Sequence, residues 1–149
     1  MKIRTEVEID ASPAEVWAAF DDPERRRRWQ PSLQREEQVS GKAGERGSVS
    51  RRLYSEDGRQ TPIVEIVTER REPHFAASSL EAPRYTATIV NHFEAAGHGT
   101  RWVSYANIRF HGLRRFVSPW LKGALQQRSD EDMQRFKLMI ESDLAERDT

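Results

Sequence analysis

Apolar and charged residues alternate over the first ten positions of the chain. Ile3, Thr5, Val7 and Ile9 occupy every second position and alternate with a lysine, an arginine and two glutamates. Successive side chains of a strand point to opposite sides of a sheet, so this period is typical of a strand with one buried face. The pattern predicts a strand over residues 2–9.

Two short helices are predicted directly after this strand. The stretch SPAE at 12–15 has the form of a capping box, in which the serine and glutamate side chains each accept a hydrogen bond from the other residue's backbone amide. Its proline suits the first helical position. The pair DP at 22–23 repeats the acidic cap and the proline. We expect one helix over 13–21 and a second over 23–29.

The middle of the chain shows strand and turn signals without a helical run. Breaks that contain glycine or proline divide it into six candidate strands, at 33–40, 47–55, 60–71, 74–81, 84–95 and 100–111. The connections between these strands are short, and short connections join antiparallel neighbours. We therefore expect an antiparallel meander.

After Gly112 the period of the apolar residues changes to three and four, which is typical of a helix. The residues with this spacing are Phe116, Val117, Trp120, Leu121, Ala124, Leu125, Met133, Phe136, Ile140 and Leu144. Ser118 can cap the helix and Pro119 can occupy its first position. We expect the helix to run to about residue 147. A helix with one apolar stripe must bury that stripe, and the concave face of a curved antiparallel sheet is the available surface.

Composition limits the functions that this order of elements can serve. A chain of 149 residues is expected to form a single domain, residues 1–149, with a substantial core. The sum of Lys and Arg is 24 and equals the sum of Asp and Glu, whereas nucleic-acid-binding chains usually carry a basic excess. Cysteine is absent, which excludes disulfides and thiol catalysis. The sequence lacks a signal-peptide core and a transmembrane segment, so we expect a cytoplasmic protein.

The run ERRRRWQP at 24–31 raises the question of a basic patch built for nucleic acid. Acidic residues lie on both sides of the run, at 21, 22 and 24 and again at 36 and 37, and nearly cancel its charge. We expect the arginines to form a solvated helix face whose aliphatic stems lie along the ring of Trp29. Trp29 itself is expected to pack as a plug at one end of the core, and no nucleic acid is expected as a partner.

The last two strands carry an unusual mixture on one face. Large aromatic residues alternate there with small or polar ones, for example Trp102 with Ser104 and Ala106, and Phe93 with Asn91. A packed core avoids unpaired polar atoms, whereas a ligand pocket is mostly apolar with a few polar groups. We therefore predict a ligand cavity between sheet and helix. The expected lining is Trp17, Phe20, Trp29, Leu53, Ile66, Tyr85, Ala87, Ile89, Asn91, Phe93, Trp102, Ser104, Ala106, Ile108, Phe110, Trp120, Leu121, Leu125 and Met133.

Signals for catalysis are weak. His74, His92, His98 and His111 do not have the spacing of metal ligands, and the acidic cluster at 130–132 is typical of a solvated helix face. The sequence contains no nucleophile-elbow, phosphate-loop or zinc-protease motif. An acid–base pair could be built from tyrosines, histidines or carboxylates, but no residue is singled out, so the catalytic residues stay unknown. No metal and no cofactor are expected.

Three stretches of the chain resemble the START-like, Bet v 1-like (SRPBCC) superfamily and, within it, the polyketide cyclase/dehydrase group. They are IDASPAEVWAAFDDPERRRRWQPSL, GTRWVSYANIRFHGLRRF and SPWLKGALQQRSDEDMQRFKLMIESDL. The resemblance implies an α+β helix-grip fold, in which a seven-stranded antiparallel sheet wraps around the long C-terminal helix and encloses a cavity. Members of the superfamily bind lipids, sterols, polyketides or plant hormones, and some catalyse cyclisation or dehydration.

Two functions stay open, because function lies in the site and not in the fold. The first is binding of a small hydrophobic ligand, such as a lipid or a polyketide-like or aromatic molecule. The second is a polyketide cyclase/dehydrase or aromatase-type enzyme that uses the same cavity. Titratable groups converging inside the cavity would favour the enzyme, and an apolar cavity with one polar anchor would favour the binding protein. A third reading is protein–protein interaction through the outer face of the sheet. The oligomeric state and the ligand's identity are left open.

Overall fold

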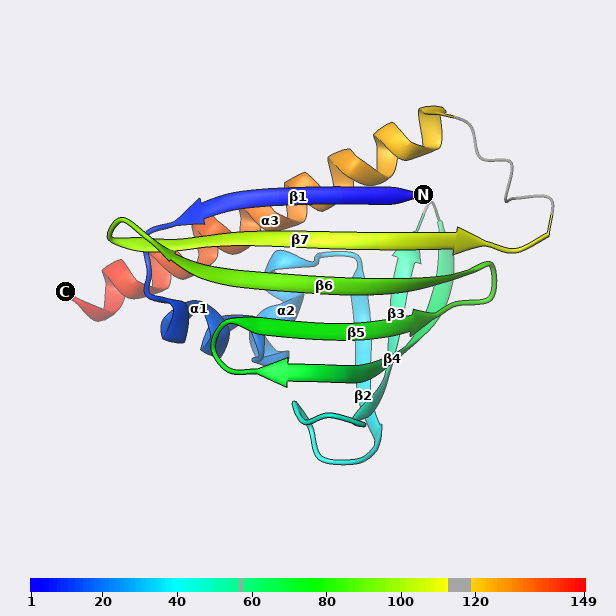
Figure 1. Cartoon of the computed structure of the whole chain (residues 1–149), viewed down its shortest axis with the longest axis horizontal. Helices are drawn as coiled ribbons and strands as arrows, with labels where there is room; N and C mark the ends of the chain where they lie inside the picture. Colours follow the sequence, from blue (N-terminus) through cyan, green and yellow to red (C-terminus); the bar gives the residue numbers. More distant parts are fainter. Residues whose placement is uncertain (57, 113–118) are drawn as a thin grey trace.

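The computed structural model of the protein describes residues 1–56, 58–112 and 119–149 (Figure 1). In chain order its elements are β1 (Lys2–Ile9), α1 (Pro13–Phe20), α2 (Pro23–Trp29), β2 (Leu33–Ser40), β3 (Val49–Glu56), β4 (Arg59–Arg71), β5 (Phe75–Glu81), β6 (Tyr85–Ala96), β7 (Gly99–Phe110) and α3 (Pro119–Arg147). The predicted order of elements is confirmed, with ends that differ by at most two residues. The predicted cap at Ser118 and the predicted helical positions of Phe116 and Val117 lie outside the described residues.

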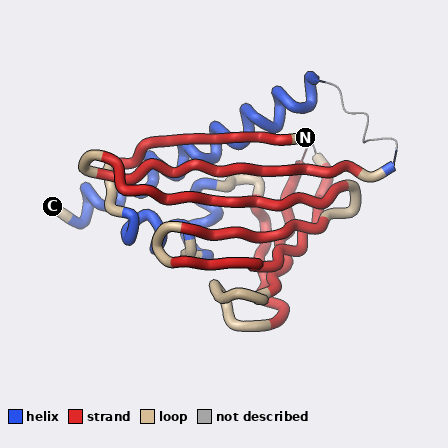
Figure 2. The backbone as a smooth tube through the Cα atoms, viewed as in Figure 1, coloured by secondary structure: helices blue, strands red, loops and turns tan. Residues whose placement is uncertain are grey.

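The described strands form one antiparallel sheet of seven strands, in the order β1-β7-β6-β5-β4-β3-β2. Figure 2 shows that the sheet bends strongly, so that β2 and β3 run steeply across the direction of β1 and β7. The helix α3 crosses the enclosed side of this bend and packs against β1. This is the helix grip that the resemblance implied. None of the helices in the described ranges has both the length and the apolarity needed to cross a membrane.

Local sequence signals explain the first elements. Exposed and buried residues alternate along the whole of β1. At the start of α1, the amide of Glu15 donates to Ser12 Oγ over 3.2 Å, and the amide of Ser12 donates to Glu15 Oε1 over 3.0 Å. The capping box is therefore formed in both directions. At the start of α2, Asp22 Oδ1 accepts from the amide of Glu24 over 3.0 Å. These caps turn the chain twice between β1 and β2.

One end of the space between sheet and α3 is filled by aromatic rings, which we call the aromatic cluster. Its members come from α1, α2, β6, β7 and α3, with ring centroids between 4.9 and 6.2 Å apart: Trp17, Phe20, Trp29, Phe93, Trp102 and Phe136. Phe93 and Phe136 are completely buried, and Trp29 is 5% exposed. Trp29 thus lies at one end of the core, as its sequence context predicts. The cluster belongs to the larger of two packed cores in the described part of the chain, and the smaller one consists of Leu33, Tyr54 and Ile63.

The apolar stripe of α3 is buried only in the second half of the helix. Met133, Phe136, Met139 and Ile140 are buried, whereas Trp120 near the start of the helix is 82% exposed. The helix continues through Gly123, and among the described residues no heavy atom beyond its chain neighbours and the helix's own backbone lies within 4 Å of the position where a Cβ would lie. The first half of α3 is therefore less closely packed than the second.

The arginine run of α2 forms only part of the solvated face that its sequence suggested, because Arg27 and Arg28 are exposed but Arg26 is not. Arg26 is buried, and its guanidinium donates to the carboxylate of Glu36 and, over 3.2 Å, to the backbone oxygen of Phe20. Arg28 makes two hydrogen bonds to the carboxylate of Asp143 on α3, of 2.9 and 2.8 Å. Specific partners on neighbouring elements therefore hold these two side chains.

The other two arginines of the run are engaged as well. Arg27 donates to the backbone oxygen of Gln34 on β2, and Arg25 Nε lies 3.5 Å from Asp22 Oδ2. The run attaches the short helix α2 to β2 on one side and to α3 on the other. Counter-charges along the sequence could be seen in advance, but these contacts across elements could not.

Candidate ligand-binding site

A cavity of about 1120 Å³ lies between the enclosed face of the sheet and α3. The aromatic cluster contributes Phe20, Trp29 and Trp102 to one end of it. At the opposite end, which we call the turn end, the lining includes Arg59 beside the β3–β4 turn and Arg84 beside the β5–β6 turn. Ligand pockets usually hold about 300–1,000 Å³, so this cavity is large enough for a lipid or a compound of several rings.

One side of the cavity is apolar, and we call it the apolar wall. It consists of inward-facing residues of β6 and β7 together with residues of α3: Ala87, Ile89, Ala106, Ile108, Phe110, Leu121, Leu125 and Met133. The strand positions follow the two-residue period of the sequence, and the register pairs Ile89 with Ala106 and Ala87 with Ile108. Small side chains in the middle of this wall leave space that larger ones would fill.

Most of the residues expected from the sequence lie on the cavity. They are Phe20, Trp29, Tyr85, Ala87, Ile89, Asn91, Trp102, Ser104, Ala106, Ile108, Phe110, Leu121, Leu125 and Met133. The expectation needs correction at five positions. Trp17 and Phe93 are buried inside the aromatic cluster, where other rings cover them, and Trp120 is exposed at the start of α3. Leu53 and Ile66 occupy positions of β3 and β4 that face away from the cavity.

The second side of the cavity is charged, and we call it the polar wall. Arg26 of α2, Arg52 of β3 and Glu65 of β4 line it, and Glu36 of β2 lies behind them. Arg52 Nη2 donates to Glu65 Oε1 over 2.9 Å, and Arg52 Nε donates to Glu36 Oε1 over 3.3 Å. Glu36 also accepts from Arg26. The two arginines and two glutamates balance each other in charge.

The environment of Arg52 keeps its guanidinium charged. Burial opposes the charge of the guanidinium, but its neighbours, with the carboxylate of Glu65 first among them, outweigh burial, and the pKa of Arg52 is raised. Tyr54 lies beside it and donates from its hydroxyl to Gln30 Oε1 over 2.9 Å. Burial raises the pKa of Tyr54, so this phenol stays protonated. The polar wall was missed because the sequence gives no sign that inward charges on different strands meet.

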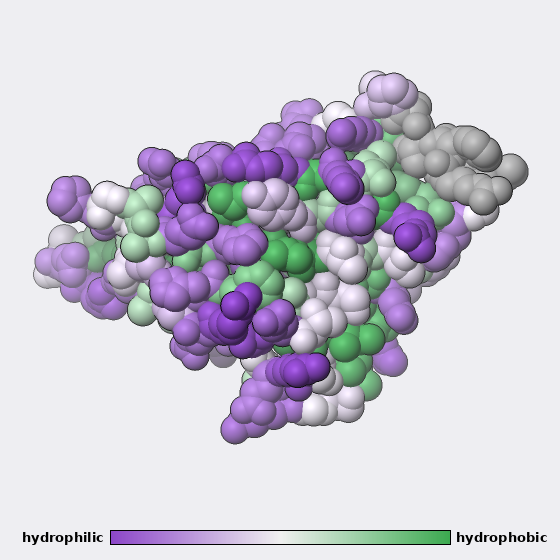
Figure 3. Space-filling view, viewed as in Figure 1, coloured by the Kyte–Doolittle hydropathy of each residue, from purple (hydrophilic) through white to green (hydrophobic). Residues whose placement is uncertain are grey.

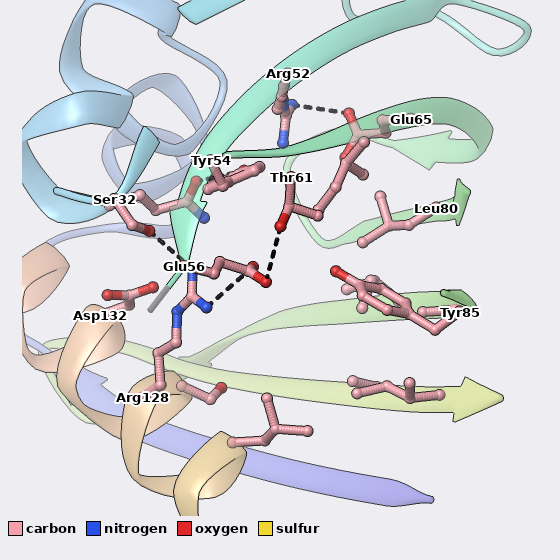
Figure 4. A pocket seen from close by; sticks show the side chains of 18 of the residues that line it. Ser32, Arg52, Tyr54, Glu56, Thr61, Glu65, Leu80, Tyr85, Arg128 and Asp132 are labelled. Carbon is pink, nitrogen blue, oxygen red and sulfur yellow. Dashed lines mark hydrogen bonds and ion pairs between the residues drawn. The ribbon is translucent and has the colours of Figure 1, made fainter. Parts of the chain in front are cut away.

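A second polar group lies toward the turn end, where Arg128 reaches from α3 to the sheet (Figure 4). Arg128 Nη1 lies 3.0 Å from Glu56 Oε1 on β3, and Arg128 Nη2 donates to Ser32 Oγ over 2.8 Å. Thr61 Oγ1 donates to the other oxygen of Glu56 over 3.4 Å. The ion pair therefore bridges the cavity between α3 and β3.

Two further titratable side chains belong to this end of the cavity. Asp132 lies one turn after Arg128 on α3, and burial raises the pKa of its carboxyl group although Arg128 and Arg135 oppose the shift. Tyr85 points into the cavity in Figure 4, and burial, with a smaller effect of the Glu56 carboxylate, raises its pKa to about 12. An ion pair, a carboxyl group of raised pKa and a phenol thus share one cavity.

A row of small polar side chains crosses the floor of the cavity beside the aromatic cluster. Asn91 of β6 pairs in register with Ser104 of β7, and Ser104 pairs with Thr5 of β1. Thr5 Oγ1 lies 2.6 Å from the hydroxyl oxygen of Ser129 on α3, and Trp102 Nε1 donates to Asn91 Oδ1 over 2.9 Å. We call these four residues, Thr5, Asn91, Ser104 and Ser129, the polar row.

The arrangement can hold an apolar body on one side and can exchange protons or hydrogen bonds on the other. Carboxylates, a phenol and guanidinium groups are the side chains that serve acid–base chemistry and charge stabilisation in enzymes. Among residues 1–56, 58–112 and 119–149, no three His, Asp or Glu side chains come close enough together to hold a metal ion. The outer face of the sheet is mixed, with apolar patches among hydrophilic residues (Figure 3), and ion pairs cross it, such as Arg101 Nη2 with Glu94 Oε2 at 2.9 Å.

Comparison with known proteins gives a family and a set of similar folds. The family described as "Polyketide cyclase / dehydrase and lipid transport" matches residues 1–141. No curated protein matches the sequence. A START superfamily protein from Mycobacterium smegmatis has a TM-score of 0.81 at 14% identity, over 95% of this chain and 97% of that chain. A protein from Thermus thermophilus has a TM-score of 0.80 at 16% identity, over 95% of this chain and 98% of that chain.

The same fold occurs in Ara h 8.0201, with a TM-score of 0.78 at 17% identity, over 95% of this chain and 98% of that chain. At such low identity these likenesses concern the fold alone.

Proposed function

This chain belongs to the polyketide cyclase/dehydrase and lipid transport family, and on that premise we propose that residues 1–149 act as one domain whose cavity binds a small, largely apolar molecule. The observation that carries the proposal is the apolar wall, which faces about 1120 Å³ of space. Apolar side chains that face such a space lack contacts that a ligand would supply. The body of the ligand would lie along β6, β7 and the first half of α3.

The polar wall supports a ligand that also carries polar atoms. Buried polar groups cost free energy unless they are hydrogen-bonded, and a purely hydrocarbon ligand would cover Arg52, Tyr54 and Glu65 without adding partners. A molecule with an apolar face and an oxygenated edge would match both walls. Polyketide-like and oxygenated aromatic compounds have this character, and so do some lipids.

Binding is tested with a neutral naphthalene dye, N-phenyl-1-naphthylamine, titrated into protein that has been stripped of copurified molecules under denaturing conditions and refolded. We expect saturable binding of one dye per chain, with a dissociation constant in the micromolar range, which is about −8 kcal/mol. Quenching of tryptophan emission reports binding, because Trp29 and Trp102 line the cavity. The absence of saturable binding by the refolded protein, across several neutral apolar dyes, would contradict the proposal.

A second function is favoured by the titratable groups near Arg128. In a dehydration, Glu56 would accept the proton next to a carbonyl group, Arg128 would stabilise the charge on the carbonyl oxygen, and Asp132 would give a proton to the leaving hydroxyl, which departs as water. A β-hydroxy ketone that fits the cavity then gives an enone, whose ultraviolet absorbance is easily followed. Turnover that Glu56→Gln abolishes, with dye binding retained, supports the enzyme. Binding without turnover supports a carrier.

A further inference from the structure

The polar row contains two side chains whose hydrogen-bonding groups are not used by the protein. Asn91 is 6% exposed and lines the cavity, and its Oδ1 is occupied by Trp102 Nε1 at 2.9 Å. Within the described residues, no acceptor is found for the amide NH2 of Asn91 or for the hydroxyl of Ser104. Both groups line the cavity, where a ligand or a water molecule can accept their hydrogen bonds.

The hydrogen bond from Trp102 fixes which edge of the amide is available. Since the indole N–H donates to Oδ1, the NH2 group must lie on the other edge of the Asn91 amide plane. Ser104 is the register partner of Asn91 on β7, and directly opposed side chains have Cβ atoms about 4.5–5.5 Å apart. The amide and the hydroxyl therefore lie close enough to donate to one oxygen atom.

The neighbours of this pair decide what kind of oxygen it suits. Two residues before Asn91 on β6, Ile89 pairs with Ala106 of β7. On its other side, Asn91 pairs with Ala76 of β5. The next strand places Arg70 opposite Ala76. Its guanidinium lies 2.8 Å from Asp21 Oδ1, which balances its charge, while its Nη1 is a buried donor without a partner among the described residues. A carboxylate brought to this floor would be buried without a new counter-charge, which is costly. A neutral oxygen would not have this penalty.

We propose that Asn91 and Ser104 form an oxygen-binding subsite at the floor of the cavity, which selects ligands with a neutral carbonyl or ether oxygen at the end that enters first. This proposal deepens the proposed function and rests on it, because the ligand must occupy the cavity. It sets an orientation: the oxygen lies beside the aromatic cluster, and the apolar body extends along Ile89, Ala106 and Ile108 toward the turn end.

The test compares two probes of nearly equal shape, 2-acetylnaphthalene and 2-isopropenylnaphthalene, which differ by an oxygen in place of a methylene group. Their dissociation constants are measured by calorimetry with the wild type, Ser104→Ala and Asn91→Leu. We expect each substitution to reduce the affinity for the ketone relative to the alkene by about three- to tenfold, the effect of one hydrogen bond. The affinity for the alkene itself should change by less than about twofold.

Ser78→Ala is the matched control, because Ser78 also lines the cavity but donates to Glu65 Oε2 over 3.3 Å on the polar wall. This control should leave unchanged the ratio of the dissociation constants for the ketone and the alkene. A third probe, 2-naphthoic acid, should bind the wild type more weakly than the ketone. Asn91→Leu leaves the Trp102 indole without its acceptor, so if that variant does not fold, Ser104→Ala decides.

If Ser104→Ala has the same ratio of ketone and alkene dissociation constants as the wild type, and the wild type binds both probes, the proposed subsite is wrong. The proposed function is then not affected. Tighter binding of the carboxylate than of the ketone would also overturn it, because the floor would then favour charge. If neither neutral probe binds the folded wild type, the proposed function fails and the subsite fails with it. The three results are distinguishable in one set of titrations.

Discussion

Single side chains divide the interior into parts with different chemistry. Ile89 and Ala106 face the cavity with hydrocarbon only, whereas Arg52 and Glu65 face it with charges that satisfy each other at 2.9 Å. Buried charges are tolerated where they are paired and hydrogen-bonded. The pairs therefore explain how charged groups can line a cavity whose other wall is apolar. Removing one charged side chain of the network would leave its partners with less counter-charge.

Arg26 should be the arginine of the α2 run that matters most for stability. Arg26→Met leaves the Glu36 carboxylate with Arg52 alone and removes the donor to the Phe20 backbone oxygen. We expect the free energy of unfolding to fall by about 3 kcal/mol, as for other broken buried ion pairs. Arg27→Met, which removes an exposed side chain, should cost less than about 1 kcal/mol. Urea unfolding of both variants checks the difference, and equal losses would contradict the role given to Arg26.

Among the elements, α2 shows how a helix of less than two full turns is held in place. It contacts β2 through Arg27 and α3 through Arg28, in addition to the packing of its terminal Trp29 on Phe136. Short helices have little stability of their own, so such tertiary contacts decide whether they form. The position of α2 in turn fixes one end of the cavity.

The bond between α2 and α3 should give a pH-dependent contribution to stability. The hydrogen-bonded guanidinium of Arg28 lowers the pKa of Asp143 in the folded protein. A depressed carboxyl pKa stabilises the fold above the pKa of an unfolded aspartate, about 3.9, and this stabilisation is lost as the pH falls through the folded-state pKa. Arg28→Gln should therefore lower the free energy of unfolding at pH 7 by less than about 1 kcal/mol, since the pair is partly exposed.

The difference between wild type and Arg28→Gln should shrink as the pH falls below about 4. Denaturant titrations at pH 7 and at pH 3 measure it. Arg27→Gln serves as control, because Arg27 donates to a backbone oxygen that does not titrate in this range. A difference that stays constant down to pH 3 would show that Asp143 is not the partner that matters.

The elements themselves could be predicted because their periods differ. Alternation marked β1, β6 and β7, the capping box marked α1, and the spacing of three and four marked α3. The inward faces of β6 and β7 followed from their apolar positions. The same reasoning chose the wrong faces of β3 and β4, where Leu53 and Ile66 are apolar but face outward.

The reason for this failure is physical. Arg52 and Glu65 face inward because they are paired with each other and with Glu36, and a pairing between strands is not visible in either strand alone. The same limit applies to the aromatic cluster. Phe93 lies on the expected face, but rings from α1 and β7 cover it, and only the packing of several elements separates filled core from open cavity.

At the scale of the whole molecule, the larger packed core lies at one end of the interior, and the cavity extends from it toward the turn end. The second half of α3 buries Phe136 and Ile140 against the aromatic end, while the first half, with Leu121 and Leu125, faces the cavity. This division accounts for a fold that is anchored by its core and still keeps space for a ligand. We expect this space to be the binding site of the protein.

The most direct test fills the space. Ala106 lies in the middle of the apolar wall, so the ring of Ala106→Phe would project into the cavity. We predict that the dye N-phenyl-1-naphthylamine binds this variant about tenfold more weakly or worse, equivalent to about 1.4 kcal/mol or more, because ring and dye compete for one volume. The melting temperature should be unchanged or higher, whereas overpacking a filled core would cost about 1–3 kcal/mol.

Thr88→Phe is the matched control, since Thr88 is exposed on the outer face of β6 and its ring would not reach the cavity. It should bind the dye like the wild type. The measurement is the dissociation constant of the dye for Ala106→Phe, taken with the melting temperature of the ligand-free protein. We predict weaker binding by a protein that is at least as stable. A destabilised Ala106→Phe that binds the dye as tightly as the wild type would contradict it.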